Sequence, residues 1–261
     1  MVEELATKAG ETKEVSFIVN TRRPEYGDGK KVRLKDRESS DEWIAWDDKI
    51  TLEFIESKPS LQSLRIGPAP EFPTIFLLGD STMCDQPNEP YASWGQMLTR
   101  FFGEEVAIAN HGESGESYSA SLSRGRIDKV ADVMKPGDYL LLQFGHNDMK
   151  EKGEGKGAFL NFQSGMRKHI AMAREMGGFP VLVTPVHRRR FDEKGKVVHT
   201  FGDYTEAVRQ VAAEEKVPLI DLQARSAELY EALGPEGSGR FLKTVTERIT
   251  TTMARISWRN V

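Results

Sequence analysis

The chain has 261 residues, of which 38% are hydrophobic and 29% charged, and its formal net charge is −4. This length allows one large domain, or a medium domain beside a smaller one, and the acidic balance argues against a nucleic-acid-binding surface, which needs a basic stripe. A single cysteine, Cys84, excludes an internal disulfide, and no apolar stretch approaches the roughly 20 residues of a membrane span. Because Met1–Lys8 is polar and resembles no secretory leader, we expect a soluble cytoplasmic protein.

Residues 1–70 predict a small β domain. Short stretches rich in β-branched and aromatic residues, separated by Gly, Asp and Ser turns, are predicted to form four strands: Val15–Val19, Lys31–Leu34, Ile50–Ile55 and Ser60–Ile66. Three prolines in Gly67–Pro73 forbid regular structure and mark the domain boundary. Four strands make only a thin sheet, so we expect part of a β-sandwich, either the second half of a longer domain or a naturally reduced one.

Strand and helix patterns alternate from residue 71 to residue 243. The predicted strands are Ile75–Leu78, Val106–Ala109, Tyr139–Phe144, Phe179–Val183 and Val217–Ile220. The predicted helices are Trp94–Phe102, Ile127–Met134, Phe162–Met176, Tyr204–Glu215 and Ala224–Leu233. Such alternation implies a parallel sheet with helices on both faces, and right-handed crossovers then give an α/β fold, a flavodoxin-like three-layer αβα sandwich with a five-stranded parallel sheet.

Polar groups follow three successive strands of this predicted sheet. The first strand runs into Gly79–Ser81, Gly115 comes after the second, and Gly145–Asp148 ends the third. Open α/β sheets bind ligands at this edge, where a serine hydroxyl becomes a nucleophile once a base removes its proton. A glycine N–H and the Asn147 amide are suitable donors to the oxyanion of acyl transfer. The pattern therefore predicts a serine esterase.

Each of these groups also has a purely structural explanation when it is judged alone. Gly79–Ser81 is common turn chemistry, Gly115 supplies a positive φ, Asn147 holds a turn, and His146 is a hydrogen-bonded loop histidine. Their position after successive strands of one sheet favours the functional interpretation.

The same blocks resemble those of the SGNH (GDSL-type) hydrolase superfamily and, within it, the rhamnogalacturonan acetylesterase-like branch. The resemblance covers about residues 73–242 and is carried by Gly79–Met83, Tyr91–Gly95, Arg124–Arg126, Phe144–Asp148, Thr184–His187 and Val217–Asp221. It implies Ser81 as the nucleophile, with the Ser81 and Gly115 backbone N–H groups and the Asn147 side chain as the oxyanion hole. One position departs from the pattern, because the arginine that often follows the glycine of the second block is Glu116 here.

The general base that the resemblance implies, in a late Asp-x-x-His motif, is absent from the chain as written. No histidine follows His199, and residues 244–261 show no amphipathic pattern. Reading the tail one nucleotide out of frame from Thr244 is compatible with Asp-Gly-Thr-His followed by Tyr-Gly-Ala, and the codons for Met253 and Ala254 force that glycine. We therefore hypothesise that 244–261 is an aberrant, frameshifted tail.

These observations predict a carbohydrate esterase that removes O-acetyl groups from a pectic polysaccharide or oligosaccharide through an acetyl-enzyme, impaired here by loss of the catalytic Asp and His. A lipase or thioesterase on the same scaffold and a non-catalytic carbohydrate-binding pseudoenzyme remain alternatives. His111, His146 and His187 lie near strand ends and are candidate substitutes for the base. No metal or organic cofactor is implied, and neither nucleic acid nor a membrane is an expected partner. A missing C-terminal helix would uncover apolar sheet surface, which predicts marginal stability or a homo-oligomer.

Overall fold

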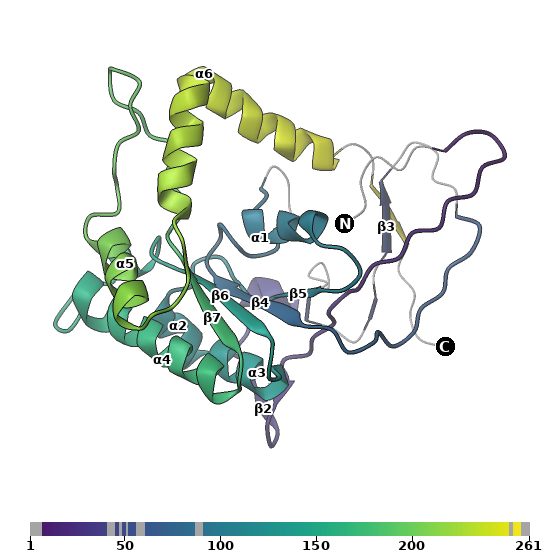
Figure 1. Ribbon diagram of the computed structural model, residues 1–261, viewed down its shortest axis with the longest axis horizontal. Coiled ribbons are helices and arrows are strands. Elements are labelled where there is room, and N and C mark those ends of the chain that lie inside the picture. The colour runs from purple at the N-terminus through teal and green to yellow at the C-terminus, as the bar shows by residue number, and fades with distance from the viewer. Residues whose placement is uncertain are drawn as a thin grey trace.

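The computed structural model describes residues 7–40, 45–46, 49–50, 52–55, 61–86, 91–250 and 253–256, and for 52–55, 240–250 and 253–256 it gives the backbone alone. Five parallel strands form its central sheet, in the order β5 (Ala107–Asn110), β4 (Thr74–Gly79), β6 (Tyr139–Gln143), β7 (Phe179–Val183) and β8 (Leu219–Ile220). This is the strand order of flavodoxin-like sheets, so the predicted α/β fold is confirmed (Figure 1).

The strands of the central sheet are mostly apolar because helices cover both faces of the sheet. Successive side chains of a strand point to opposite faces. Phe76 and Leu142 accordingly belong to the larger hydrophobic core, whereas Leu77 and Leu141 belong to a smaller cluster on the other side. The run Thr74–Gly79 therefore reads as continuously hydrophobic rather than alternating.

Helices pack on the sheet in two layers (Figure 1). The larger core is covered by α2 (Tyr118–Ser123), α3 (Arg126–Val133), α4 (Gln163–Glu175) and α5 (Tyr204–Glu214). The opposite face is covered by α1 (Trp94–Met97), the 3-10 helix η2 (Leu98–Phe101) and the start of α6 (Leu222–Thr250). Shorter helical turns are η1 (Asp36–Ser39), η3 (Asp148–Lys150) and the π-helical η4 (Ala158–Phe162). In the part of the chain that the structure describes, no helix is both long and apolar enough to cross a membrane.

Two helical predictions differ from the structure in detail. The predicted helix Trp94–Phe102 is divided into α1 and η2, and the helix predicted to end at Leu233 continues beyond a break in helical geometry at Gly234, before Pro235. The sequence pattern predicts no helix at α2, because six residues are too few to show a helical apolar period. Ser117 caps the N-terminus of that helix, because its hydroxyl accepts a hydrogen bond from Ala120 N at 3.2 Å.

The partial β-sandwich expected over residues 1–70 is not confirmed in the described residues. The strands there are β1 (Glu25–Tyr26), which pairs with β2 (Lys30–Lys31), and β3 (Leu52–Ile55), which pairs with β9 (Met253–Ile256). The predicted strand Val15–Val19 and the described part of Ser60–Ile66 form no strand, while Thr51 and Ser60 lie outside the described residues. Phe17 and Ile66, which the predicted strands would have turned toward a sandwich core, are 51% and 62% exposed.

The described parts of the segment 244–261 are regular. Residues 244–250 continue α6, and Met253–Ile256 forms β9. Backbone conformation does not report the reading frame of a gene, so the frameshift hypothesis stays a prediction.

The packing of the larger core predicts that Leu142→Ala strongly destabilises the folded protein. Leu142 is almost completely buried in β6, and removal of its side chain leaves a cavity that is expected to lower the free energy of unfolding by about 2–5 kcal/mol. Leu229→Ala, at an exposed position of α6, is the matched control and should change it by less than about 0.5 kcal/mol. Urea unfolding measures both, and equal effects would contradict the described core.

Candidate active site

Three loops leave the carboxyl ends of β4, β5 and β6 at one edge of the sheet. Because β4 pairs with β5 on one side and with β6 on the other, this edge contains the topological switch point where such sheets bind ligands. Ser81 follows β4, Gly115 lies in the loop after β5, and Asn147 lies in the loop after β6. The fold thus brings together the loops that carry all three predicted site residues.

The first loop is a tight turn held by a buried carboxylate. The Asp80 carbonyl accepts from Met83 N and Cys84 N, each at 3.0 Å. Asp80 Oδ1 accepts from Thr82 N at 3.0 Å and from Thr82 Oγ1 at 2.9 Å. Ser81, at the outside of this turn, is partly exposed rather than buried in the core.

Gly79 is required where β4 enters the turn. A Cβ at this position would lie 2.5 Å from Gln143 O of the neighbouring strand and 2.7 Å from Met83 Sδ. No side chain fits there, so glycine allows β4 and β6 to run side by side up to the point where their loops diverge.

The second loop is anchored to the first by main-chain and side-chain hydrogen bonds. Glu113 N donates to Gly79 O at 3.0 Å. Gln86 Nε2 donates to Ser81 O at 2.7 Å and to Ser114 Oγ at 3.4 Å. Gly115, with φ of +78°, is exposed at the tip of this loop in a backbone conformation that favours glycine.

The third loop contacts the second through Asn147. Asn147 Nδ2 donates to Glu116 O at 2.9 Å, and its Oδ1 accepts from Lys150 Nζ at 2.9 Å. The amide therefore lies beside the residue that follows Gly115. An amide nitrogen carries two hydrogens, so Asn147 has a second N–H for a ligand.

Asp148 joins this third loop to the start of α2. Its buried carboxyl accepts from Tyr118 N and from Gly145 N, each at 2.9 Å. Burial raises the pKa of Asp148 to about 7, although both hydrogen bonds act in the opposite direction.

The three candidate histidines occupy different surroundings. His146 Nδ1 lies 3.1 Å from Asp80 Oδ2, and its ring packs edge-on against Phe201 at 4.8 Å between centroids. A carboxylate at Nδ1 is the arrangement that orients a catalytic imidazole, because it leaves Nε2 for the reaction. Of the three candidates, His146 is the one for which the structure shows a carboxylate partner.

The other two candidates fit a catalytic role less well. His111 is buried, its ring meets Trp46 edge-on at 5.6 Å, and burial together with nearby Arg22 and Lys129 holds its pKa well below the usual range. His187 Nδ1 faces Arg188 O at 3.0 Å.

Sequence reasoning missed three residues that shape this site. For Asp80 the sequence shows no partner, although its place in the Gly-Asp-Ser block is a signal for a site role. Gln86 and Lys35 bind the second loop from outside any strand or helix pattern, and nothing in the sequence marks them. Across the described ranges, no cluster of three His, Cys, Asp or Glu side chains is suited to hold a metal ion.

A serine turn, a glycine loop and an asparagine amide at the switch point of such a sheet are suited to ester hydrolysis. The model of the GDSL-like lipase/acylhydrolase family matches residues 77–242, and the chain belongs to that family. Its likeness to the rhamnogalacturonan acetylesterase-like branch is confirmed by two relatives from Bacillus subtilis (strain 168). Rhamnogalacturonan acetylesterase RhgT is 45% identical over 168 residues, which are 64% of this chain and 72% of RhgT. Probable rhamnogalacturonan acetylesterase YesY is 37% identical over 167 residues, which are 62% of this chain and 76% of YesY.

A solved structure supports the same fold. The crystal structure of the protein YxiM from Bacillus subtilis superposes with a TM-score of 0.60 at 26% identity. The superposition covers 69% of this chain and 56% of that chain, so this chain spans little more than half of YxiM.

The raised pKa of Asp148 predicts a pH-dependent stability. The folded pKa is about 7 and the ordinary value 3.8, so the protonated carboxyl is favoured by folding. Its stabilising contribution is present below about pH 4 and is lost as the pH rises through about 7. The free energy of unfolding of the wild type minus that of Asp148→Asn, measured by urea unfolding, should therefore fall between pH 4 and pH 8. The exposed Asp203→Asn is the control, and a difference for Asp148→Asn that does not change with pH would contradict the prediction.

Proposed function

We propose that the chain is a carbohydrate esterase that removes O-acetyl groups from a pectic polysaccharide or oligosaccharide. The convergence of the Ser81, Gly115 and Asn147 loops at the switch point of the sheet carries this proposal, together with the 45% identity to a rhamnogalacturonan acetylesterase. Ser81 Oγ attacks the acetyl carbonyl carbon, the sugar oxygen leaves with a proton, and water then hydrolyses the acetyl-enzyme.

The oxyanion of the tetrahedral intermediate would be bound by the Ser81 and Gly115 N–H groups and by Asn147 Nδ2. One such donor typically contributes about 2.7–4 kcal/mol to lowering the barrier. The hydrogen bond between Asn147 Nδ2 and Glu116 O supports this assignment, because it holds the amide beside the glycine loop.

The general base that the family resemblance implies for this reaction, a histidine in an Asp-x-x-His motif, is not found in this sequence. No Asp-x-x-His follows residue 199, and we propose that a frameshift from Thr244 removed it. Loss of a triad member leaves only a residual ~10³–10⁴-fold catalysis over water, so the chain as written is proposed to be a slow enzyme. The contact between His146 and Asp80 supports His146 as the group that supplies the remaining acid–base catalysis.

Replacement of the nucleophile tests the activity. Ser81→Ala should lower acetate release from acetylated rhamnogalacturonan well below the wild-type rate, because no attacking oxygen remains. Ser123→Ala, on the exposed surface of α2, should retain the wild-type rate. Equal traces of acetate from the wild type and Ser81→Ala would instead support a carbohydrate-binding protein without turnover.

A second pair of variants tests whether His146 is the general base. General acid–base groups contribute about 10²–10⁴-fold, so His146→Asn should lower kcat by at least about 10²-fold. His199→Asn, at an exposed position, should leave kcat unchanged. A protein with residues 244–261 restored to the alternative frame should be faster than the chain as written. An unchanged rate in His146→Asn would exclude this histidine as the base.

A further inference from the structure

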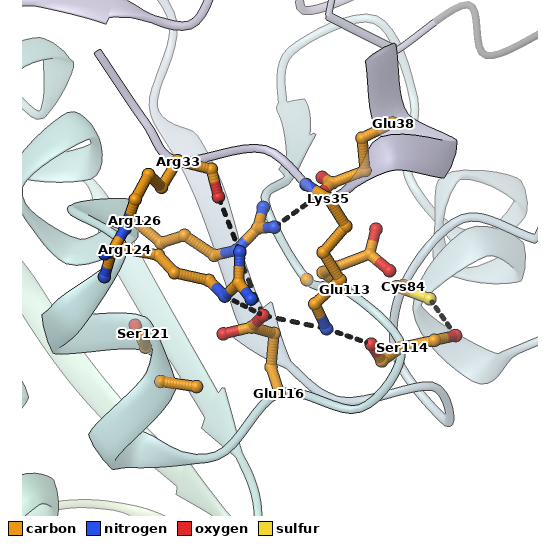
Figure 2. Close-up of polar contacts among 12 residues, drawn as sticks. Arg33, Lys35, Glu38, Cys84, Glu113, Ser114, Glu116, Ser121, Arg124 and Arg126 are labelled. Atoms are coloured by element: carbon orange, nitrogen blue, oxygen red, sulfur yellow. Dashed lines mark hydrogen bonds and ion pairs between the residues drawn. The ribbon is translucent and has the colours of Figure 1, made fainter. Parts of the chain in front are cut away.

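Glu116, the residue after Gly115, places a fully buried carboxylate beside the proposed oxyanion hole. Burial of a charge is unfavourable unless it is paired. Glu116 Oε1 lies 3.0 Å from Lys35 Nζ, 3.4 Å from Arg124 Nε and 3.7 Å from Arg126 Nε. Figure 2 shows these cations gathered around it. The carboxylate is thus the centre of a cationic cluster.

Lys35 holds the glycine loop on both sides of Gly115. Its Nζ donates to Ser114 O at 2.5 Å and is paired with the Glu116 carboxylate (Figure 2). A Cβ built on Gly115 would lie 3.4 Å from the same nitrogen. One ammonium group therefore bridges the residues that flank the proposed oxyanion donor.

The segment 33–38, which carries Lys35, is itself fixed to the helical layer. Arg33 N donates to Arg124 O at 2.9 Å, and Arg124 Nη1 donates back to Arg33 O at 3.0 Å. Arg126 Nη2 donates to Glu38 Oε2 at 2.5 Å, and both side chains are buried. Because both ends of the segment are held, Lys35 is not free to follow a displaced loop.

A further ion pair and two hydrogen bonds connect this segment to the rest of the site. The ion pair joins Arg37 of the segment to the buried Glu113 of the glycine loop. The first hydrogen bond joins Glu113 N of that loop to Gly79 O at the end of β4, and in the second Glu116 O accepts from Asn147 Nδ2 at 2.9 Å. A movement of the loop 113–116 would therefore displace the Gly115 N–H and the Asn147 amide together.

We propose that residues 33–38 form a clamp that positions the oxyanion hole, with Lys35 and Glu116 as its positioning residues. This inference rests on the proposed esterase function of the same site. The clamp orders the loop before substrate arrives, so that the Gly115 N–H and the Asn147 amide need no rearrangement when negative charge develops on the carbonyl oxygen.

Hydrogen exchange of the loop tests the clamp without relying on activity. In Lys35→Met, which keeps the length of the side chain and removes its charge, the peptide 111–117 should exchange at least about ten times faster than in the wild type. Glu116→Gln should have the same effect. Lys30→Met, at an exposed lysine that precedes the clamp, is the matched control and should leave the exchange unchanged. Equal exchange in Lys35→Met and Lys30→Met overturns the proposal.

Kinetics then separate positioning from a general loss of structure. In a chain with Ser81-dependent acetate release, Lys35→Met should lower kcat about 10–100-fold while KM changes less than twofold. Lys35→Arg keeps the positive charge and should retain most of the wild-type kcat. A kcat equal to that of Lys30→Met overturns the positioning role. If the parent chain releases no acetate through Ser81, the proposed function fails, whereas the exchange of peptide 111–117 still decides whether the clamp exists.

Discussion

The parallel pairing of β4 with β6 is the constraint on which the candidate site depends. The two strands stay in register from Ile75 and Tyr139 up to Gly79 and Gln143, and the glycine permits this approach because a Cβ would collide with the carbonyl of Gln143. The loops that carry Ser81 and Asn147 therefore start from adjacent points. The hydrogen bond between Glu113 N and Gly79 O brings the loop that carries Gly115 to the same place.

Around this point the chain buries several carboxylates, which is unusual for charged groups and restricts how the loops can move. Asp80 holds the serine turn and His146, while Asp148 holds the asparagine loop against α2. Glu113 and Glu116 attach the glycine loop to the segment 33–38. The family resemblance implies an arginine where Glu116 stands, and the cations of Lys35, Arg124 and Arg126 give a physical reason why a carboxylate is accommodated there. A cation at this position would instead face three like charges.

The sequence was sufficient to predict the parallel sheet, because buried strands such as Tyr139–Gln143 are marked by continuous apolar residues and their ends by polar blocks. It was insufficient for the first 70 residues. Apolar stretches such as Val15–Val19 resemble strands, but a strand needs a partner, and local pattern does not encode one. The contacts of the clamp join residues 76 positions apart (Arg37 and Glu113) to 91 positions apart (Arg33 and Arg124), and ion pairs leave no periodicity from which such distant partners can be read. The pairing of His146 with Asp80 was hidden for the same reason.

The central claim is that the Ser81 hydroxyl, the Gly115 N–H and the Asn147 amide face one pocket. A crystal structure of the protein after reaction with a serine-directed phosphonate tests it most directly, because the bound phosphonyl group mimics the tetrahedral intermediate. The account predicts a covalent bond to Ser81 Oγ, with a phosphonyl oxygen about 2.7–3.1 Å from Gly115 N and from Asn147 Nδ2. A phosphonyl group attached elsewhere, or one whose oxygen points away from both donors, would contradict it.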